Sequence, residues 1–239
     1  MLSRGLSIEL NAVPVAGHSL ELLQSEVLKP AHVVLELDGG IQVKIYAGVH
    51  SERDFHKGGW YVFCHKRMVL GPERTLATGW GGDGTHQYHA DFAYFRGYVF
   101  FDAEDTSLLP WTTTKTGIDQ DSPVYRRARV EMMFCTRQVQ DYLRQLASEV
   151  AAVKHEAEPN HPLGDALEKA SLVSVEAIEL GSFSAPKRIS APKPKSNVQR
   201  IQYDRPKDRV KKVMQQLGVD SFKKVGESTF DYYYSEECE

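Results

Sequence analysis

The stretch FRGYVFFD, at residues 95–102, decides the fold class of this chain. It is almost continuous in large aromatic and β-branched residues, which is the composition of a β-strand. A run this apolar, without clean alternation, indicates a strand buried at the centre of a sheet. The acidic residues that follow, DAEDTS at 102–107, predict the exposed end of that strand.

Two hairpins are predicted on its N-terminal side. Residues 33–37 and 41–46 alternate apolar and polar side chains, and the turn signal Asp38-Gly39-Gly40 separates them. GGWYVFCHKRMVL, at 58–70, predicts a second pair of strands that turn at His65 and Lys66. A tight turn with positive φ at both central residues disfavours His-Lys, so this turn is expected to be altered.

A long helix is predicted to follow, from Ser122 as N-cap and Pro123 at the first helical position. It should end near Glu156, before Pro159 and Pro162. One apolar stripe at steps of three and four runs along it, formed by Met132, Cys135, Val139, Tyr142, Leu146, Val150 and Val153. A sheet backed by such a helix predicts the α+β class.

The C-terminal third predicts a boundary between domains. Residues 157–180 should form a short helix and a strand, and the Pro- and Lys-rich stretch 184–197 reads as a linker. VQRIQYD beyond it predicts a strand, and the following segment a short helix that ends at Gly218. The expected organisation is therefore a domain over 1–157, a connecting segment over 158–197, and a small α/β module over 198–239.

Composition excludes few classes of function. The chain is 41% hydrophobic and 26% charged, and its three cysteines are widely spaced, which predicts neither disulfides nor a CxxC metal pair. No run approaches the roughly 18–20 apolar residues of a membrane span. We therefore expect a cytoplasmic protein without a membrane partner.

Positive charge is concentrated in residues 187–224, which contain twelve lysines and arginines but only three aspartates. This segment could bind nucleic acid or an acidic partner, or dock within the chain. The aromatic residues Phe230, Tyr232, Tyr233 and Tyr234 could stack on bases, or could instead pack on the preceding helix. The candidate polyanion-binding residues are Arg205, Lys207, Arg209, Lys211 and Lys212.

Several motifs are better explained as structural features than as nucleotide, metal or catalytic sites. GWGGDG, at 79–84, lacks both the GK[ST] and the GxGxxG spacing, so a flexible loop is favoured over a nucleotide loop. His86 and His89 have no second pair of ligands to complete a metal set. Asp102, Glu104 and Asp105 fit a solvated strand end better than a magnesium site, and Cys64 fits the core better than a nucleophile.

The loop LPWTTTKTGID, at 109–119, is the strongest candidate site. It presents Lys115 among Thr113, Thr114 and Thr116, between a buried strand and a helix N-terminus. A lysine there could counter a phosphate, with hydroxyls and backbone N–H groups as further donors. A polar surface turn is the alternative.

The segments GWYVFCHKRMVL, FRGYVFFDAEDTSLLPWTTTKTGID, DSPVYRRAR and VGESTFDYYYSEE resemble the C-terminal part of bacterial GHKL-superfamily ATP-binding proteins. That superfamily includes histidine kinase, gyrase B, heat-shock chaperone and MutL ATP-binding domains. In gyrase B and MutL relatives, a transducer domain with a mixed sheet backed by helices follows the nucleotide domain. A lysine from this transducer reaches the γ-phosphate of ATP.

The resemblance implies that Lys115 is this lysine and that the chain transmits the nucleotide state of a preceding domain. ATP and Mg²⁺ would be cofactors of the intact protein only, and the partners would be a nucleotide domain, in cis or in trans, and a second copy in a homodimer. Arg67 matches an arginine of the MutL-type turn, whereas His65 and Lys66 depart from its Asn-Gly pair. The Glu and Asn of the nucleotide-site helix and the Asp-x-Gly-x-Gly motif have no counterpart. We therefore expect no catalytic residues, and neither tight ATP binding nor hydrolysis, by this chain alone.

Overall fold

The computed structural model describes residues 8–14, 19–154, 161–188, 201 and 204–238. The chain divides into two compact units, Met1–Ala191 and Pro192–Glu239. The described elements are of mixed α+β type, as the sequence predicts.

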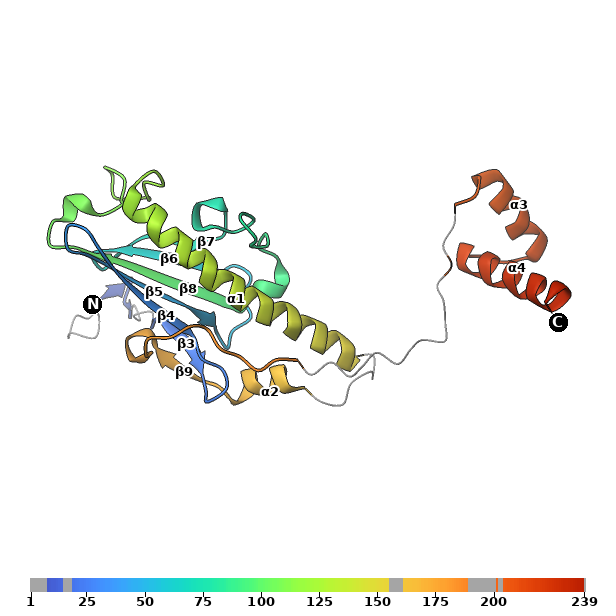
Figure 1. Ribbon diagram of the computed structural model, residues 1–239, viewed down its shortest axis with the longest axis horizontal. Coiled ribbons are helices and arrows are strands. Elements are labelled where there is room, and N and C mark those ends of the chain that lie inside the picture. The colour runs from blue at the N-terminus through green and yellow to red at the C-terminus, as the bar shows by residue number, and fades with distance from the viewer. Residues whose placement is uncertain (1–7, 15–18, 155–160, 189–200, 202–203, 239) are drawn as a thin grey trace. The chain divides into compact units, whose positions relative to one another are not determined.

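The first unit is built on a five-stranded mixed sheet (Figure 1). Its strand order is β4 (Ala31–Leu37), β5 (Ile41–Val49), β8 (Phe95–Asp102), β6 (Gly59–Cys64) and β7 (Arg67–Glu73). β6 and β8 run parallel, and the other neighbours are antiparallel. The strand 95–102 is therefore central, as predicted.

Both predicted hairpins form. The turn at His65 and Lys66 has the positive φ values, 49° and 65°, that a two-residue hairpin requires. The expectation that His-Lys would alter this turn was wrong. The N–H of His65 donates to the carbonyl of Phe101 at 2.9 Å, so the neighbouring central strand holds the turn.

Helix α1 (Pro123–Lys154) lies along one face of the sheet (Figure 1). The N–H of Arg126 donates to the carbonyl of Ser122, which confirms the predicted start. Most of the predicted stripe is buried, but Val150 is 46% exposed, so the stripe leaves the core before the helix ends. The predicted end near Glu156 lies outside the described residues.

A two-stranded ribbon of β3 (Glu21–Gln24) and β9 (Ser171–Ser174) packs near the opposite face. Leu22 from this ribbon belongs to a second apolar cluster with Tyr46 and Tyr98 of the sheet. The expected short helix and strand of 157–180 are α2 (Pro162–Lys169) and β9. Strand β3 was not predicted.

The stretch 161–188 belongs to the first compact unit, although the sequence places it in a connecting segment. Lys29 pairs with Ser184 and His32 with Gly181, so this stretch borders the edge strand β4. The observed division lies after Ala191, not at 157. Short elements complete the unit: β1 (Glu9–Leu10), β2 (Val13–Pro14), and the 3-10 turns η2 (Leu76–Thr78), η3 (Ala90–Phe92), η4 (Thr106–Leu108) and η5 (Val175–Ala177).

The described part of the second unit is helical. Helix α3 (Lys207–Leu217) ends at Gly218, whose φ of 63° confirms the predicted cap. Ser221 then caps α4 (Phe222–Glu237) by accepting from the N–H of Lys224. The predicted strand 198–204 falls almost wholly outside the described residues. Over the described ranges, no helix is both long and apolar enough to cross a membrane.

Candidate functional site

The lysine loop lies at one end of the sheet, between β8 and α1. Because β6 and β8 are parallel, the chain leaves both strands at this same end. The β4–β5 turn lies there too, since Gln42 pairs with Asp102. A Cβ added at Gly39 would lie 3.0 Å from the side chain of Leu108, so η4, just before the lysine loop, packs against that turn.

Backbone hydrogen bonds close the loop on itself. Trp111 forms a bridge with Ile118, and the N–H of Thr112 donates to the carbonyl of Gly117 at 3.0 Å. Inside this frame, the N–H of Lys115 donates to the carbonyl of Thr112 at 2.7 Å. The loop is therefore a small ordered hairpin with Lys115 near its tip.

Lys115 has a backbone conformation that non-glycine residues rarely adopt. Its φ is 54°, which costs on the order of 1 kcal/mol relative to glycine. Its Nζ lies 4.3 Å from the centre of the Trp111 ring, and the residue is exposed. The ammonium is thus held over an indole without a carboxylate partner among the described ion pairs.

The threonines form a chain of hydroxyls beside the lysine. The Oγ1 of Thr114 lies 3.3 Å from that of Thr112 and 2.8 Å from that of Thr116. Thr112 was not singled out from the sequence. Thr113 stands outside this chain and lines an open depression together with Trp111, Thr112, Ile118, Asp119 and Gln120.

The glycine-rich loop 79–84 uses its backbone donors internally. The N–H groups of Gly81 and Gly82 donate to the carbonyl of His86 and the hydroxyl of Thr85. Gln140 of α1 binds both backbone groups of His86 at 2.9 Å, which fastens the loop to the helix. These paired donors favour the loop interpretation over a phosphate cradle.

His86 and His89 do not converge on one point. His86 Nε2 lies 2.9 Å from a guanidinium nitrogen of Arg144, and His89 accepts from the N–H of Asp91 as the cap of η3. Both rings pack against Phe92. The two histidines therefore hold a loop rather than form a pair of ligands.

Asp105 at the acidic strand end and the buried Cys64 have structural roles. Asp105 caps η4 by accepting from the N–H of Ser107, and the pKa of its carboxyl is lowered first by the Ser107 hydroxyl and then by this N–H. Nowhere in the described ranges do three His, Cys, Asp or Glu side chains gather as metal ligands. Cys64 is fully buried, and burial raises the pKa of its thiol to about 12, as fits a core residue.

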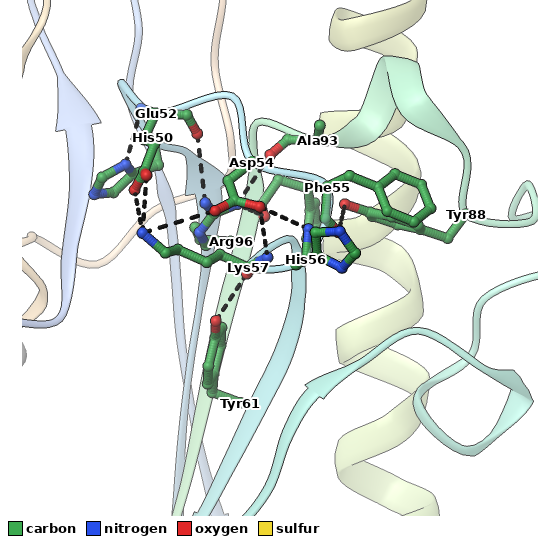
Figure 2. Close-up of polar contacts among 11 residues, drawn as sticks. His50, Glu52, Asp54, Phe55, His56, Lys57, Tyr61, Tyr88, Ala93 and Arg96 are labelled. Atoms are coloured by element: carbon green, nitrogen blue, oxygen red, sulfur yellow. Dashed lines mark hydrogen bonds and ion pairs between the residues drawn. The ribbon is translucent and has the colours of Figure 1, made fainter.

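Figure 2 shows a polar cluster at the other end of the sheet, which the sequence reading missed. Arg96 is only 3% exposed and donates to the carbonyls of Ala93 and Phe95 at 3.0 and 2.8 Å, and to that of Glu52 at 3.4 Å. The carboxylate of Glu52 binds Lys57 Nζ at 2.8 Å. An arginine inside the apolar run FRGYVFF was the available signal.

This cluster orders the loop between β5 and β6. Asp54 accepts from the N–H of His56 at 2.7 Å, and the hydroxyl of Tyr61 donates to the carbonyl of Lys57 at 2.8 Å (Figure 2). Burial and the nearby Arg96 charge lower the pKa of His50, whose Nδ1 accepts from the N–H of Glu52. Most polar groups of this cluster form hydrogen bonds or ion pairs with one another, so the cluster anchors the loop between β5 and β6.

In the second unit, the candidate polyanion-binding residues are all exposed. Arg205 precedes α3, and Lys207, Arg209, Lys211 and Lys212 lie on the helix, outside its apolar stripe. The aromatic residues at 230 and 232–234 belong to α4 and are 52–69% exposed. The alternative that they pack closely on the preceding helix is therefore wrong.

Of the predicted site residues, the structure brings Thr114, Lys115 and Thr116 together, leaves Thr113 beside them, and adds Trp111 and Thr112. Lys66 in the β6–β7 turn is also exposed with a positive φ, but of these two lysines only Lys115 has its ammonium held over an aromatic ring, that of Trp111. The chain matches no protein-family model, no curated protein and no solved structure.

Proposed function

We propose that the first unit is a transducer of the GHKL type and that Lys115 contacts the terminal phosphate of ATP held by a nucleotide domain. The observation that carries this proposal is the strained, exposed Lys115 at the tip of an ordered loop. Strain of this kind persists where the surrounding structure enforces it, often at ligand contacts. A mixed sheet covered by a long helix is consistent with the transducer class.

The contacts of Lys115 suit a residue that changes partners. An exposed ammonium over an indole ring gains about 0.5–1 kcal/mol. A hydrogen bond to a charged group contributes about 1.5–3 kcal/mol. Lys115 would therefore leave Trp111 for a phosphate oxygen when a nucleotide domain presents one, with a net gain on the order of 1–2 kcal/mol.

This gain is enough to shift a conformational equilibrium. A difference of 1–2 kcal/mol changes the ratio of two states by a factor of roughly 5–30. Hydrolysis removes the terminal phosphate, and Lys115 then returns to its intramolecular contact. Because β8 and α1 flank the loop, the change would reach the central strand and the long helix first. The proposal assigns the adenine pocket and the magnesium ligands to the nucleotide domain.

The test measures ATP hydrolysis by a GHKL nucleotide domain, alone and mixed with the full chain. We expect the chain to stimulate turnover and Lys115→Gly to reduce the stimulation by roughly 5–30-fold, the factor that 1–2 kcal/mol corresponds to. Glycine adopts φ of 54° without strain, so this variant should fold at least as stably as the parent. Loss of stimulation then reports the missing ammonium.

Two controls make the result specific. Lys57→Ala removes an exposed lysine at the opposite end of the sheet and should leave stimulation intact. Thr113→Val removes the hydroxyl outside the threonine chain and should weaken stimulation less than Lys115→Gly. If Lys115→Gly stimulates as well as the parent, or if the chain never stimulates, the proposed function is wrong.

A further inference from the structure

The described residues of the second unit form no buried core. Helices α3 and α4 are in contact, and Val210, Val213 and Met214 of α3 and Val225 and Thr229 of α4 are only half-buried. Across residues 201 and 204–238, no side chain is fully buried. A unit this small cannot gain enough from such contacts to offset its ordering entropy, so it needs a further surface.

An aromatic stripe on α4 supplies that surface. Phe222, Phe230, Tyr233 and Tyr234 follow one side of the helix and are 72%, 54%, 63% and 52% exposed. Phe230 and Tyr234 already stack, with ring centres 6.4 Å apart. Gly226 lies in the same row, and a Cβ there would find nothing within 4 Å, which leaves a gap between two aromatic side chains.

The charges of α4 select the direction of a partner helix. Lys223 and Lys224 lie at the N-terminal end, where Lys223 pairs with Glu227 at 3.4 Å, whereas Asp231, Glu236 and Glu237 occupy the C-terminal half. A second α4 in parallel would place like charges together. In antiparallel orientation, with residue 230 facing residue 230, Lys223 comes opposite Glu237 and the Gly226 gap opposite Tyr234.

We propose that the α4 stripe binds the α4 stripe of a second copy of this chain, antiparallel about a two-fold axis at Phe230. With the two α3 helices, the assembly becomes a four-helix arrangement in which the same patch serves both copies. Nucleic acid is a poorer occupant because α4 carries four carboxylates against two lysines, a balance that disfavours a polyanion. This inference is independent of the role proposed for Lys115.

Sedimentation equilibrium of the full chain tests it. We expect a dimer whose dissociation constant rises by on the order of 10²-fold or more in Phe230→Asp, because each interface then carries two buried charges. Ser235→Asp adds the same charge on the opposite side of α4 and should leave the dimer intact. Circular dichroism of each variant checks that the helices persist.

A cross-link tests the register directly. In a Cys238→Ser background, Phe230→Cys should oxidise to a disulfide-linked dimer, because residue 230 faces itself across the axis. Asp231→Cys, one position around the helix, should not cross-link. A monomeric parent, a dimer that survives Phe230→Asp, or association only in the presence of added single-stranded DNA would each overturn the proposal.

Discussion

Replacing Gly97 by alanine should destabilise the packing of the central strand β8 against helix α1. Gly97 lies in β8 and pairs with residue 60 of β6. An added Cβ would lie 2.6 Å from Cδ2 and 2.7 Å from Cζ3 of Trp60, below the 3.0 Å that real Cβ atoms respect. The backbone at Gly97 has an ordinary φ, so any destabilisation comes from this clash alone.

The Trp60 ring cannot move aside freely. It is fully buried, and its Nε1 donates to the hydroxyl of Thr136 on α1 at 3.0 Å. That hydroxyl donates in turn to the carbonyl of Met132 at 2.8 Å. Overpacking costs about 1–3 kcal/mol, and loss of the indole hydrogen bond about 1 kcal/mol more. We therefore expect Gly97→Ala to lower the free energy of unfolding by about 2–4 kcal/mol.

Urea unfolding of the full chain, followed by far-UV circular dichroism, measures this loss. Gly181→Ala is the matched control, because a Cβ there meets nothing within 4 Å, and it should change stability by less than about 0.5 kcal/mol. Trp60→Phe should rescue part of the loss in the double variant, since a smaller ring leaves room. If Gly97→Ala is no more destabilising than Gly181→Ala, the argued rigidity of this contact is wrong.

Two further measurements probe titratable groups. Burial lowers the pKa of His32 below 6.5, so the unfolded chain binds this proton more tightly than the folded chain does. The stability present above pH 6.5 should therefore fall as the pH drops below that value. His32→Gln should flatten this decline in urea titrations, and an unchanged slope would exclude His32 as its source. A thiol reagent should modify the exposed Cys238 rapidly in the native chain. It should reach Cys64 and Cys135 only after denaturant is added, because burial raises the pKa values of both thiols to about 12. More than one rapidly reacting thiol in the native chain would contradict the buried placement of these two cysteines.

The elements that the sequence predicts correctly are those that local pattern determines. The apolar density of 95–102 marks the central strand, and the stripe after Ser122 marks α1, because each depends on neighbours close in sequence. Strand β3 has only four residues, and its partner β9 follows about 150 residues later. No turn joins these strands, so nothing local could reveal the pairing.

The sequence did not predict the surroundings of Arg96 and of the α4 aromatic residues, for a different reason. A strand pattern gives the face on which a residue lies, but not which carbonyls surround it, and three carbonyls are what make a buried guanidinium at 96 tolerable. The aromatic run at 230–234 was expected to be covered within the chain or to stack on bases. Its exposure depends on whether α3 is wide enough to cover it, which is a matter of packing and not of pattern.

Under the function proposed for Lys115, the charges around it favour direct contact with a phosphate over attraction by a long-range field. The residues that follow it include Asp119 and Asp121, and the strand end before the loop carries Glu104 and Asp105, all exposed. At physiological ionic strength, charges more than about 8 Å apart in solvent are largely screened. A free nucleotide would therefore gain little from this surface, whereas a phosphate delivered by a docked domain could come within hydrogen-bonding distance of the ammonium.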